Sequence, residues 1–247
     1  MRPGRRALLA GLLAPGTALA QPACRGTIYL TIDTGWGREA EAIAGILRRH
    51  GVRATLFLAD EPSFRGDTTL SDGWAPFWRA RAAEGHAFAS HTRRHWYFRG
   101  DPAPGRVRYA PRQGPGAEVL DGPGLCAELQ WPITRLRAMA PEALVLPLWR
   151  APGGFTTPNA LALAAACGLR HQGWTPAGFW GDELDSARHP NASLARRAMA
   201  RTGPGDVVVL HWGVRSRQEP FAGVLDQVIT GLLAKGLCFA PLPPQGI

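Results

Sequence analysis

The sequence of 247 residues lacks several features that would define its class at once. It contains no internal repeat and no low-complexity tract, which argues against a repeat array. It contains no CxxC pair, so a metal site built from cysteine thiolates is not expected. After its first 20 residues it has no apolar run long enough to span a bilayer, so we expect no stable insertion into a membrane.

The basic residues also lack the pattern of a nucleic-acid-binding protein. The formal net charge is +9, most of it from arginine. There is no basic tract interleaved with aromatic residues and no nucleic-acid-binding motif, so we expect no nucleic-acid partner. The charge suits an anionic envelope polymer, but a solvated arginine-rich surface explains it equally simply. A hydrophobic content of 45% is enough for a full core.

The first 20 residues have the features of a signal peptide. Three arginines form a basic start, residues 7–19 are a short apolar run, and residues 18–20 read Ala-Leu-Ala, as at a cleavage site. We expect export to the periplasm or secretion. The mature chain, residues 21–247, is expected to form one domain and a monomer.

Cysteine is scarce, with only four residues in the chain. In an oxidising compartment an even number suggests disulfides, and four cysteines allow three pairings. We favour Cys24–Cys238, which would tie the first strand to the last, and Cys126–Cys167, which would join neighbouring helices.

Hydrophobic patterns predict strands that alternate with helices. Apolar, β-branched runs predict strands at residues 27–33, 54–58, 85–89, 143–148, 169–174, 206–210 and 236–239. Helical periodicity predicts helices at residues 38–50, 76–84, 125–140, 158–167, 194–202 and 221–234. Such alternation predicts a parallel α/β fold. Residues 99–124, rich in Gly, Pro and Arg, show no periodic pattern and are predicted to be a surface insertion beside the site.

Chemically active side chains recur where the predicted strands end, at Asp33, His91, Arg150 and His211. His95 follows His91 by four residues, and on a helical turn both imidazoles would project from one face and suit one metal ion. Because α/β proteins place their chemistry at the carboxyl ends of strands, we expect these groups to converge. A carboxylate, a histidine pair, an arginine and a further histidine are the parts needed for metal-assisted hydrolysis.

These residues carry a resemblance to the polysaccharide deacetylase family, whose NodB-homology domain is that of carbohydrate esterase family 4. The family's motifs T-F-D-D-G, H-[ST]-x-x-H, R-x-P-x-G and L-H correspond to T-I-D-T-G, H-T-R-R-H, R-A-P-G-G and L-H, at residues 31–35, 91–95, 150–154 and 210–211. The family's Asp/Trp motif is poorly matched within residues 174–185. The resemblance covers residues 26–242 and implies a distorted (β/α) barrel of seven or eight strands.

The resemblance also implies a reaction, the removal of acetyl groups from N- or O-acetylated cell-envelope polysaccharide by attack of metal-bound water. Asp33 matches the catalytic base, Arg150 the arginine that holds this base, and His211 the general acid. Asp182, or failing that Asp185, matches the aspartate that tunes this histidine. The implied partner is an acetylated glycan substrate.

The metal implied by the resemblance is one divalent transition ion. His91 and His95 match its ligands, and Thr34 occupies the position of a third. Two imidazoles favour zinc, with cobalt or nickel as alternatives, over magnesium. The residues that we assign to substrate binding are Trp180, Trp212 and Pro152, with Trp174 as an alternative to Trp180 for the wall of the acetyl pocket.

Thr34 departs from the family, because the metal-binding position of the first motif holds an aspartate there. A neutral hydroxyl is a far poorer ligand than a carboxylate. Three possibilities stay open. The histidine pair and water hold the metal, with Thr34 hydrogen-bonded to that water; Asp33 turns to the metal; or metal binding is lost, leaving a catalytically weak or inactive barrel that binds glycan. Hydrolysis of a non-sugar amide is a further alternative.

Overall fold

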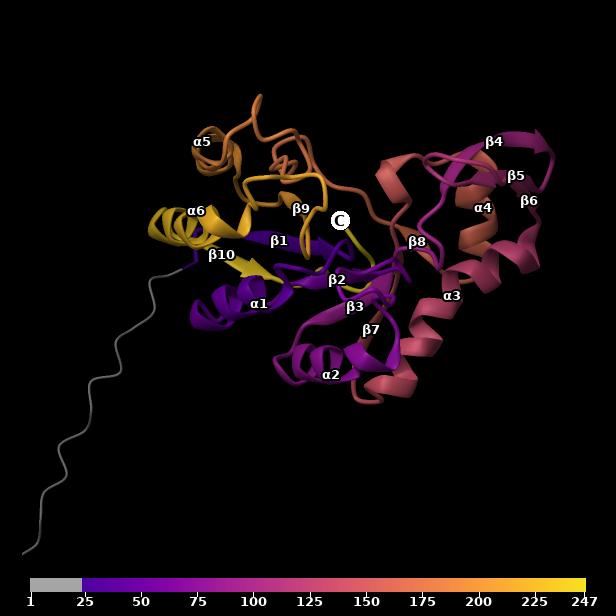
Figure 1. Ribbon diagram of the computed structural model, residues 1–247, viewed down its shortest axis with the longest axis horizontal. Helices are drawn as coiled ribbons and strands as arrows, with labels where there is room; N and C mark the ends of the chain where they lie inside the picture. Colours follow the sequence, from indigo (N-terminus) through magenta and orange to yellow (C-terminus); the bar gives the residue numbers. More distant parts are fainter. Residues whose placement is uncertain (1–23) are drawn as a thin grey trace, which may run out of the picture.

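The structure, a computed structural model, describes residues 24–247, and the predicted signal peptide lies outside the described residues. Its centre is a parallel seven-stranded sheet that curls into the predicted distorted (β/α) barrel (Figure 1). The strands are β1 (Gly26–Asp33), β2 (Thr55–Leu58), β3 (Ala87–Ser90), β7 (Leu144–Trp149), β8 (Arg170–His171), β9 (Val207–His211) and β10 (Leu237–Ala240). The order is β10-β1-β2-β3-β7-β8, and β9 pairs with β1.

Helices follow most strands and cover the outer face of this sheet, as the sequence pattern predicts (Figure 1). They are α1 (Ala40–Arg49), α2 (Ala75–Ala83), α3 (Gly122–Met139), α4 (Pro158–Ala166), α5 (Asn191–Arg201) and α6 (Ala222–Ala234). In α1 the side chains of Ile43 and Leu47 are buried, whereas Arg48 and Arg49 in its last turn are exposed. Gly51, at φ +63°, follows this helix in the left-handed conformation that commonly ends a helix.

The central strands β1, β2, β3 and β9 are largely buried on both faces, and their side chains alternate between two cores. In β1, Ile28, Leu30 and Ile32 pack with the helices in the main core. Tyr29 belongs instead to a smaller cluster made almost entirely of strand residues, on the inner face of the curled sheet. The members of this inner cluster that β2, β3, β7 and β9 contribute are Phe57, Ala87, Ala89, Leu146, Leu148 and Val207.

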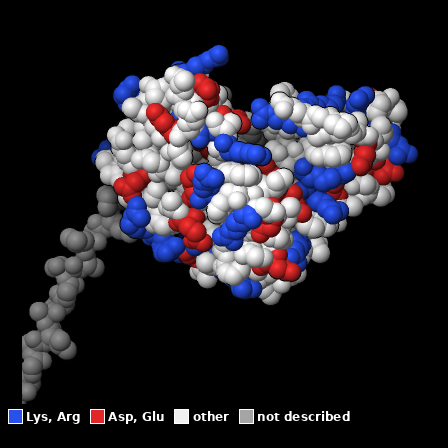
Figure 2. Space-filling model, viewed as in Figure 1, with Lys and Arg blue, Asp and Glu red and all other residues white. Residues whose placement is uncertain are grey.

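The insertion at residues 99–124 differs from the prediction that it is irregular. It forms an antiparallel sheet of β4 (Tyr97–Ala103), β5 (Arg106–Ala110) and β6 (Glu118–Leu120), seen at one end of the molecule in Figure 1. In β5, buried Val107 and Tyr109 alternate with exposed Arg106 and Arg108. Figure 2 shows basic residues over this end of the molecule. In the sequence, the exposed arginines stand between the two buried apolar residues of β5, so the apolar pattern of the strand is hard to recognise.

Both favoured cysteine pairings are confirmed. Cys24 is joined to Cys238, which links the residues before β1 to β10. Cys126 in α3 is joined to Cys167, at the end of α4. The two Cα atoms are 5.7 Å apart in each pair. Within residues 24–247, none of the helices has the length and apolar character needed to cross a membrane.

Candidate active site

Strand alternation directs the predicted side chains to the inner face of the sheet. Asp33 lies at the end of β1 and shares the parity of Tyr29, while His211 lies at the end of β9 and shares that of Val207. His91 and Arg150 each come one residue after a strand and continue the inner positions of β3 and β7. Because side chains on a strand repeat with a period of two, all four face the same space.

Asp33 and Arg150 form the buried centre of the site. The Nη1 atom of Arg150 donates to Oδ1 of Asp33 at 2.8 Å and lies 2.7 Å from Oγ1 of Thr31. The other two guanidinium nitrogens, Nε and Nη2, donate to the backbone carbonyls of Gln172 (3.0 Å) and Gly173 (3.2 Å). Arg150 is fully buried and Asp33 is 3% exposed. The guanidinium is therefore fixed by four partners, and it orients the carboxylate.

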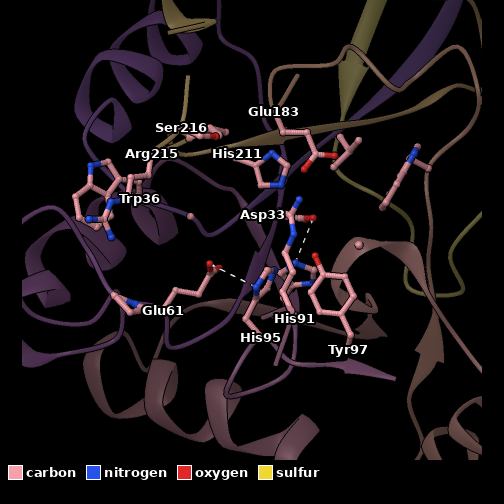
Figure 3. A pocket seen from close by; sticks show the side chains of 18 residues that line it. Asp33, Trp36, Glu61, His91, His95, Tyr97, Glu183, His211, Arg215 and Ser216 are labelled. Carbon is pink, nitrogen blue, oxygen red and sulfur yellow. Dashed lines mark ion pairs between the residues drawn. The ribbon is translucent and has the colours of Figure 1, made fainter. Parts of the chain in front are cut away.

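The charge of Arg150 sets the ionisation state of this carboxylate. Burial alone would raise the pKa of Asp33, but Arg150, with His91 and His211, more than offsets this and holds the pKa below its usual value. Asp33 is thus ionised at neutral pH. Its second oxygen, Oδ2, takes no hydrogen bond from Arg150 and lies 3.5 Å from Nε2 of His91 (Figure 3).

His91 is held with one ring nitrogen free. Its Nδ1–H donates to the carbonyl oxygen of Arg150 at 3.0 Å, which leaves the lone pair on Nε2 directed at the cavity. Burial lowers the pKa of His91 to about 4, so the imidazole is neutral at pH 7. A neutral ring whose other nitrogen donates to a carbonyl has the arrangement of a metal-binding histidine.

The turn that carries His91 and His95 is irregular, so a helical turn is not what brings the two imidazoles to one face. The two rings are nevertheless brought together, with centroids 4.8 Å apart. Thr92 and His95 have positive φ angles of 66° and 54°, which residues other than glycine rarely adopt. Such backbone strain clusters at functional sites, where the surroundings hold it in place.

The β4–β6 insertion holds this strained turn. The Tyr109 hydroxyl of β5 lies 2.9 Å from Oγ1 of Thr92 and 2.9 Å from Oε1 of Glu128. Oγ1 of Thr92 also accepts from the backbone N–H of His95 at 3.1 Å. The insertion therefore lies beside the site, as predicted, and positions its histidines.

His211 forms a pair with Asp182 across the cavity from the histidine turn. Its backbone N–H donates to Oδ2 of Asp182 at 2.8 Å, and Nδ1 lies 3.2 Å from the same oxygen. Burial opposes the charged imidazolium, but the carboxylate of Asp182 outweighs it and raises the pKa of His211 to about 10. At neutral pH this imidazole carries a proton on Nε2. Asp185 instead accepts from the backbone N–H of Arg188, so Asp182 is the aspartate that contacts His211.

Asp33, His91, His95 and His211 line one cavity of about 590 Å³, whereas Arg150 and Asp182 lie behind its wall. Figure 2 shows a hollow in this face of the molecule, and Figure 3 shows the lining side chains. The aromatic rings that line the cavity are those of Trp36, Tyr97 and Trp174. Arg112 of the insertion and Arg215, whose guanidinium lies 4.7 Å from the Trp36 ring centroid, are also part of its lining.

The three residues assigned to substrate binding do not line this cavity. Trp180 is fully buried, and its indole donates to Oγ1 of Thr202 at 2.9 Å. Trp212 is 2% exposed and packs against Phe77. Pro152 is buried at the start of the short 3₁₀ helix η2 (Pro152–Gly154). Of the tryptophans considered, Trp174 lines the cavity, whereas Trp180 and Trp212 belong to the helix-covered core.

Two acidic residues at the cavity were missed by sequence reasoning. Glu61 follows β2 by three residues, and Glu183 lies beside His211 (Figure 3). Glu61 lies outside the motifs, and Glu183 lies within the poorly matched residues 174–185. For Glu61, its place just after the strand at residues 54–58 is a signal that could have found it.

The chemistry of the donor set fits a divalent transition metal. Two imidazoles and several carboxylates face one cavity, and Nδ1 of His95 lies 3.6 Å from Oε2 of Glu61. Two ligands of one tetrahedral zinc ion are about 3.4 Å apart, close to this value and to the His91–Asp33 separation. Among residues 24–247, no three His, Cys, Asp or Glu side chains are gathered closely enough to hold an ion as they stand.

Comparison with known proteins connects this geometry to a family. The polysaccharide deacetylase family model matches residues 20–171. No curated protein matches the chain.

Solved structures of carbohydrate esterases share the fold. A family 4 carbohydrate esterase from Streptomyces lividans, in complex with acetate, is 21% identical with a TM-score of 0.62, over 90% of this chain and 96% of that one. A family 4 acetyl xylan esterase from Clostridium thermocellum, in complex with a cobalt ion, is 17% identical with a TM-score of 0.65, over 87% of each chain. A CE4 family pseudoenzyme from Bacillus anthracis is 19% identical with a TM-score of 0.63, over 87% of this chain and 63% of that one.

Proposed function

The chain belongs to the polysaccharide deacetylase family, and from this membership we propose that it is a metal-dependent hydrolase that removes acetyl groups from an N- or O-acetylated cell-envelope polysaccharide. The observation that carries the proposal is the Asp33 carboxylate, held on one oxygen by buried Arg150 and open to the cavity on the other. Its two disulfides support a location in an oxidising compartment, such as the periplasm.

Asp33 acts as the general base in this proposal. Its Oδ2 takes a proton from the attacking water, while Oδ1 stays bonded to Arg150. The lowered pKa makes Asp33 a weak base, so it deprotonates only a water that has itself been made more acidic. His91 and His95 would hold a divalent metal, which would supply this Lewis acidity and would polarise the acetyl carbonyl.

His211 acts as the general acid. Its raised pKa keeps Nε2 protonated at neutral pH, ready to protonate the leaving amine of an amide or the alkoxide of an ester. Asp182 fixes the ring through Nδ1 and stabilises its charge. The attacking water thus supplies its hydroxyl to the acetyl carbon and a proton to Asp33, the bond from that carbon to the glycan nitrogen or oxygen breaks, and His211 supplies a proton to the leaving atom, which gives acetate and the deacetylated glycan.

The cavity lining supports a glycan substrate. Trp36, Tyr97 and Trp174 offer apolar ring faces next to the reacting groups, and Arg112 and Arg215 place positive charge at the same cavity. A volume of about 590 Å³ is in the range of small-ligand pockets, enough for a few sugar units.

Acetate release tests the proposal. The purified protein, loaded with zinc or cobalt, is incubated with acetylated peptidoglycan, poly-N-acetylglucosamine, acetyl xylan and a non-sugar acetamide. We expect acetate from at least one glycan and its loss after chelation. Release from the non-sugar amide alone would contradict the assignment of a polysaccharide substrate.

A second candidate function is glycan binding without hydrolysis. Thr34, in the position of a metal-binding aspartate, favours it, and a pseudoenzyme with this fold shows that family members exist without activity. Retention of Asp33, His91, Arg150 and His211 together argues for hydrolysis, because a binding protein needs no such set. Saturable glycan binding with no acetate release would establish the second candidate.

A further inference from the structure

Glu61 occupies the rim of the site between the histidine turn and Thr34. It follows β2, the strand that lies between β1 and β3 in the sheet, and so stands between the strand ends that carry Asp33 and His91. Its side chain is 19% exposed and lines the cavity. Figure 3 shows the carboxylate directed at the ring of His95.

The carboxylate of Glu61 is held by Thr34. The Thr34 hydroxyl donates to Oε1 of Glu61 at 2.8 Å and accepts from the backbone N–H of Ala59 at 3.0 Å. Thr34 is 1% exposed and is absent from the cavity lining. The single hydroxyl proton of Thr34 is therefore used in the hydrogen bond to Glu61, and Thr34 positions this carboxylate.

The backbone of Glu61 is fixed by Thr69. The Glu61 N–H donates to Oγ1 of Thr69 at 3.1 Å, and the Thr69 N–H donates to the Glu61 carbonyl at 2.9 Å. The Thr69 hydroxyl in turn donates to the carbonyl of Ala59 at 2.7 Å. These bonds place the base of the Glu61 side chain, while its three rotatable bonds leave the carboxylate free to adjust.

Among residues 24–247, no lysine or arginine forms an ion pair with Glu61. In the described part of the chain, the ion-pair partner of Glu61 within 4.0 Å is His95 alone. A carboxylate that is four-fifths buried is costly unless it meets positive charge or a full set of hydrogen bonds. Two imidazoles and one glutamate are also the ligand set of known catalytic zinc sites that keep a position open.

We propose that Glu61 is the carboxylate ligand of the metal in this chain and takes the place of the missing aspartate, while Thr34 orients it. The ion is held by His91, His95 and Glu61, which come from the ends of β3 and β2 rather than from β1. Asp33 stays with Arg150 and remains available as the base. The inference rests on the proposed function of this site, because that function supplies the reason for a metal.

Metal affinity tests the inference without any substrate. Zinc and cobalt binding are measured by isothermal titration calorimetry, and bound metal by elemental mass spectrometry, for the wild-type protein and for Glu61→Gln. The matched control is Glu183→Gln, which neutralises another carboxylate of the same cavity. We expect one ion per wild-type chain, affinity at least about 100-fold lower in Glu61→Gln, and wild-type affinity in the control.

The supporting role of Thr34 gives a second comparison. Thr34→Ser keeps the hydroxyl and should keep the affinity, whereas Thr34→Val removes it and should lower the affinity by about 10-fold. Thr34→Asp combined with Glu61→Gln moves the carboxylate to β1 and should restore binding lost in Glu61→Gln. This recovery would show that Glu61→Gln had failed through its charge and not through misfolding.

The outcomes separate the inference from the proposed function. Wild-type affinity in Glu61→Gln, or an equal loss in Glu183→Gln, overturns the inference even where acetate is released. A wild-type protein that binds neither zinc nor cobalt also overturns it. Metal bound through Glu61 with no acetate released from any substrate supports the inference and contradicts the proposed hydrolysis.

Discussion

Asp33 and His211 stand directly opposite each other in the parallel register of β1 and β9. The proposed base and the proposed acid are thus carried by paired residues of adjacent strands. Their separation is fixed by the backbone hydrogen bonds of the sheet, so each can be changed without moving the other.

Removal of either group should abolish most of the activity. We expect Asp33→Asn and His211→Ala to lower the rate of acetate release by about 10²- to 10⁴-fold, because each loses one proton transfer. Circular dichroism should show that both variants keep the fold. Unchanged turnover in either variant would disprove the role assigned to that residue.

Arg150→Met should destabilise the protein, because it leaves Asp33 buried without a partner. We expect the free energy of unfolding at pH 7 to fall by about 3–5 kcal/mol, measured by urea denaturation. Since Arg150 lowers the pKa of Asp33, this loss should shrink as the pH falls through 3.8 and Asp33 becomes protonated.

The double variant Asp33→Asn/Arg150→Met is the control for that interpretation. It removes the unpaired charge and should recover part of the lost stability. A double variant less stable than Arg150→Met would show that the cost comes from lost packing of the guanidinium.

The Asp182–His211 pair should set the alkaline limit of activity. In the wild-type protein we expect kcat/KM to fall only as the pH approaches about 10, because His211 stays protonated below that value. In Asp182→Asn the largest contribution that opposes burial is lost, and only Asp33 and Glu183 still raise the pKa of His211, so the alkaline limb should move to lower pH. The stability that this pair contributes should be full below pH 6.5 and lost as the pH rises to about 10.

Asp185→Asn is the matched control for the pH profile, because Asp185 does not contact His211. Its alkaline limb should coincide with that of the wild-type protein. An NMR titration of His211 in the metal-free protein checks the same pKa directly. A shift of the limb in Asp185→Asn as large as in Asp182→Asn would contradict the assignment.

The two disulfides should stabilise the protein unequally. Cys24–Cys238 spans 214 residues and Cys126–Cys167 spans 41. Chain-entropy arguments give about 5 and about 4 kcal/mol for loops of these lengths. Urea unfolding of Cys24→Ala/Cys238→Ala and Cys126→Ala/Cys167→Ala should therefore show a larger loss for the first pair. The reverse order would contradict the ranking by loop entropy in the unfolded state.

The sequence alone predicted most of the parallel strands, because apolar, β-branched runs such as D-V-V-V-L at residues 206–210 favour buried strands; the strand predicted at residues 169–174 is reduced to Arg170–His171. It failed on β4–β6, where Val107 and Tyr109 are the buried residues of a short strand among arginines. A two-residue alternation is too brief to stand out from the glycines and prolines around it.

Sequence reasoning located the strand ends of the site but not its lining. Asp33, His91, Arg150 and His211 converge because the ends of parallel strands meet at one edge. Whether a tryptophan faces that space depends on the path of the loop that carries it, which residues 175–190 do not encode in any periodic pattern. Glu61 was missed for a related reason, since its partner Thr34 is recognisable only once β1 and β2 are side by side.

The central position of β1 has a consequence for the order in which the chain can fold during synthesis. β1 is the first strand to be made, yet it pairs with β9 and β10, whose residues are among the last. The barrel therefore cannot close progressively from one end. Residues 31–33 can pair early with β2, but the pairing of β1 with β9 and β10 must wait for residues 207–240, so completion of the sheet depends on contacts of long sequence separation and should be slow.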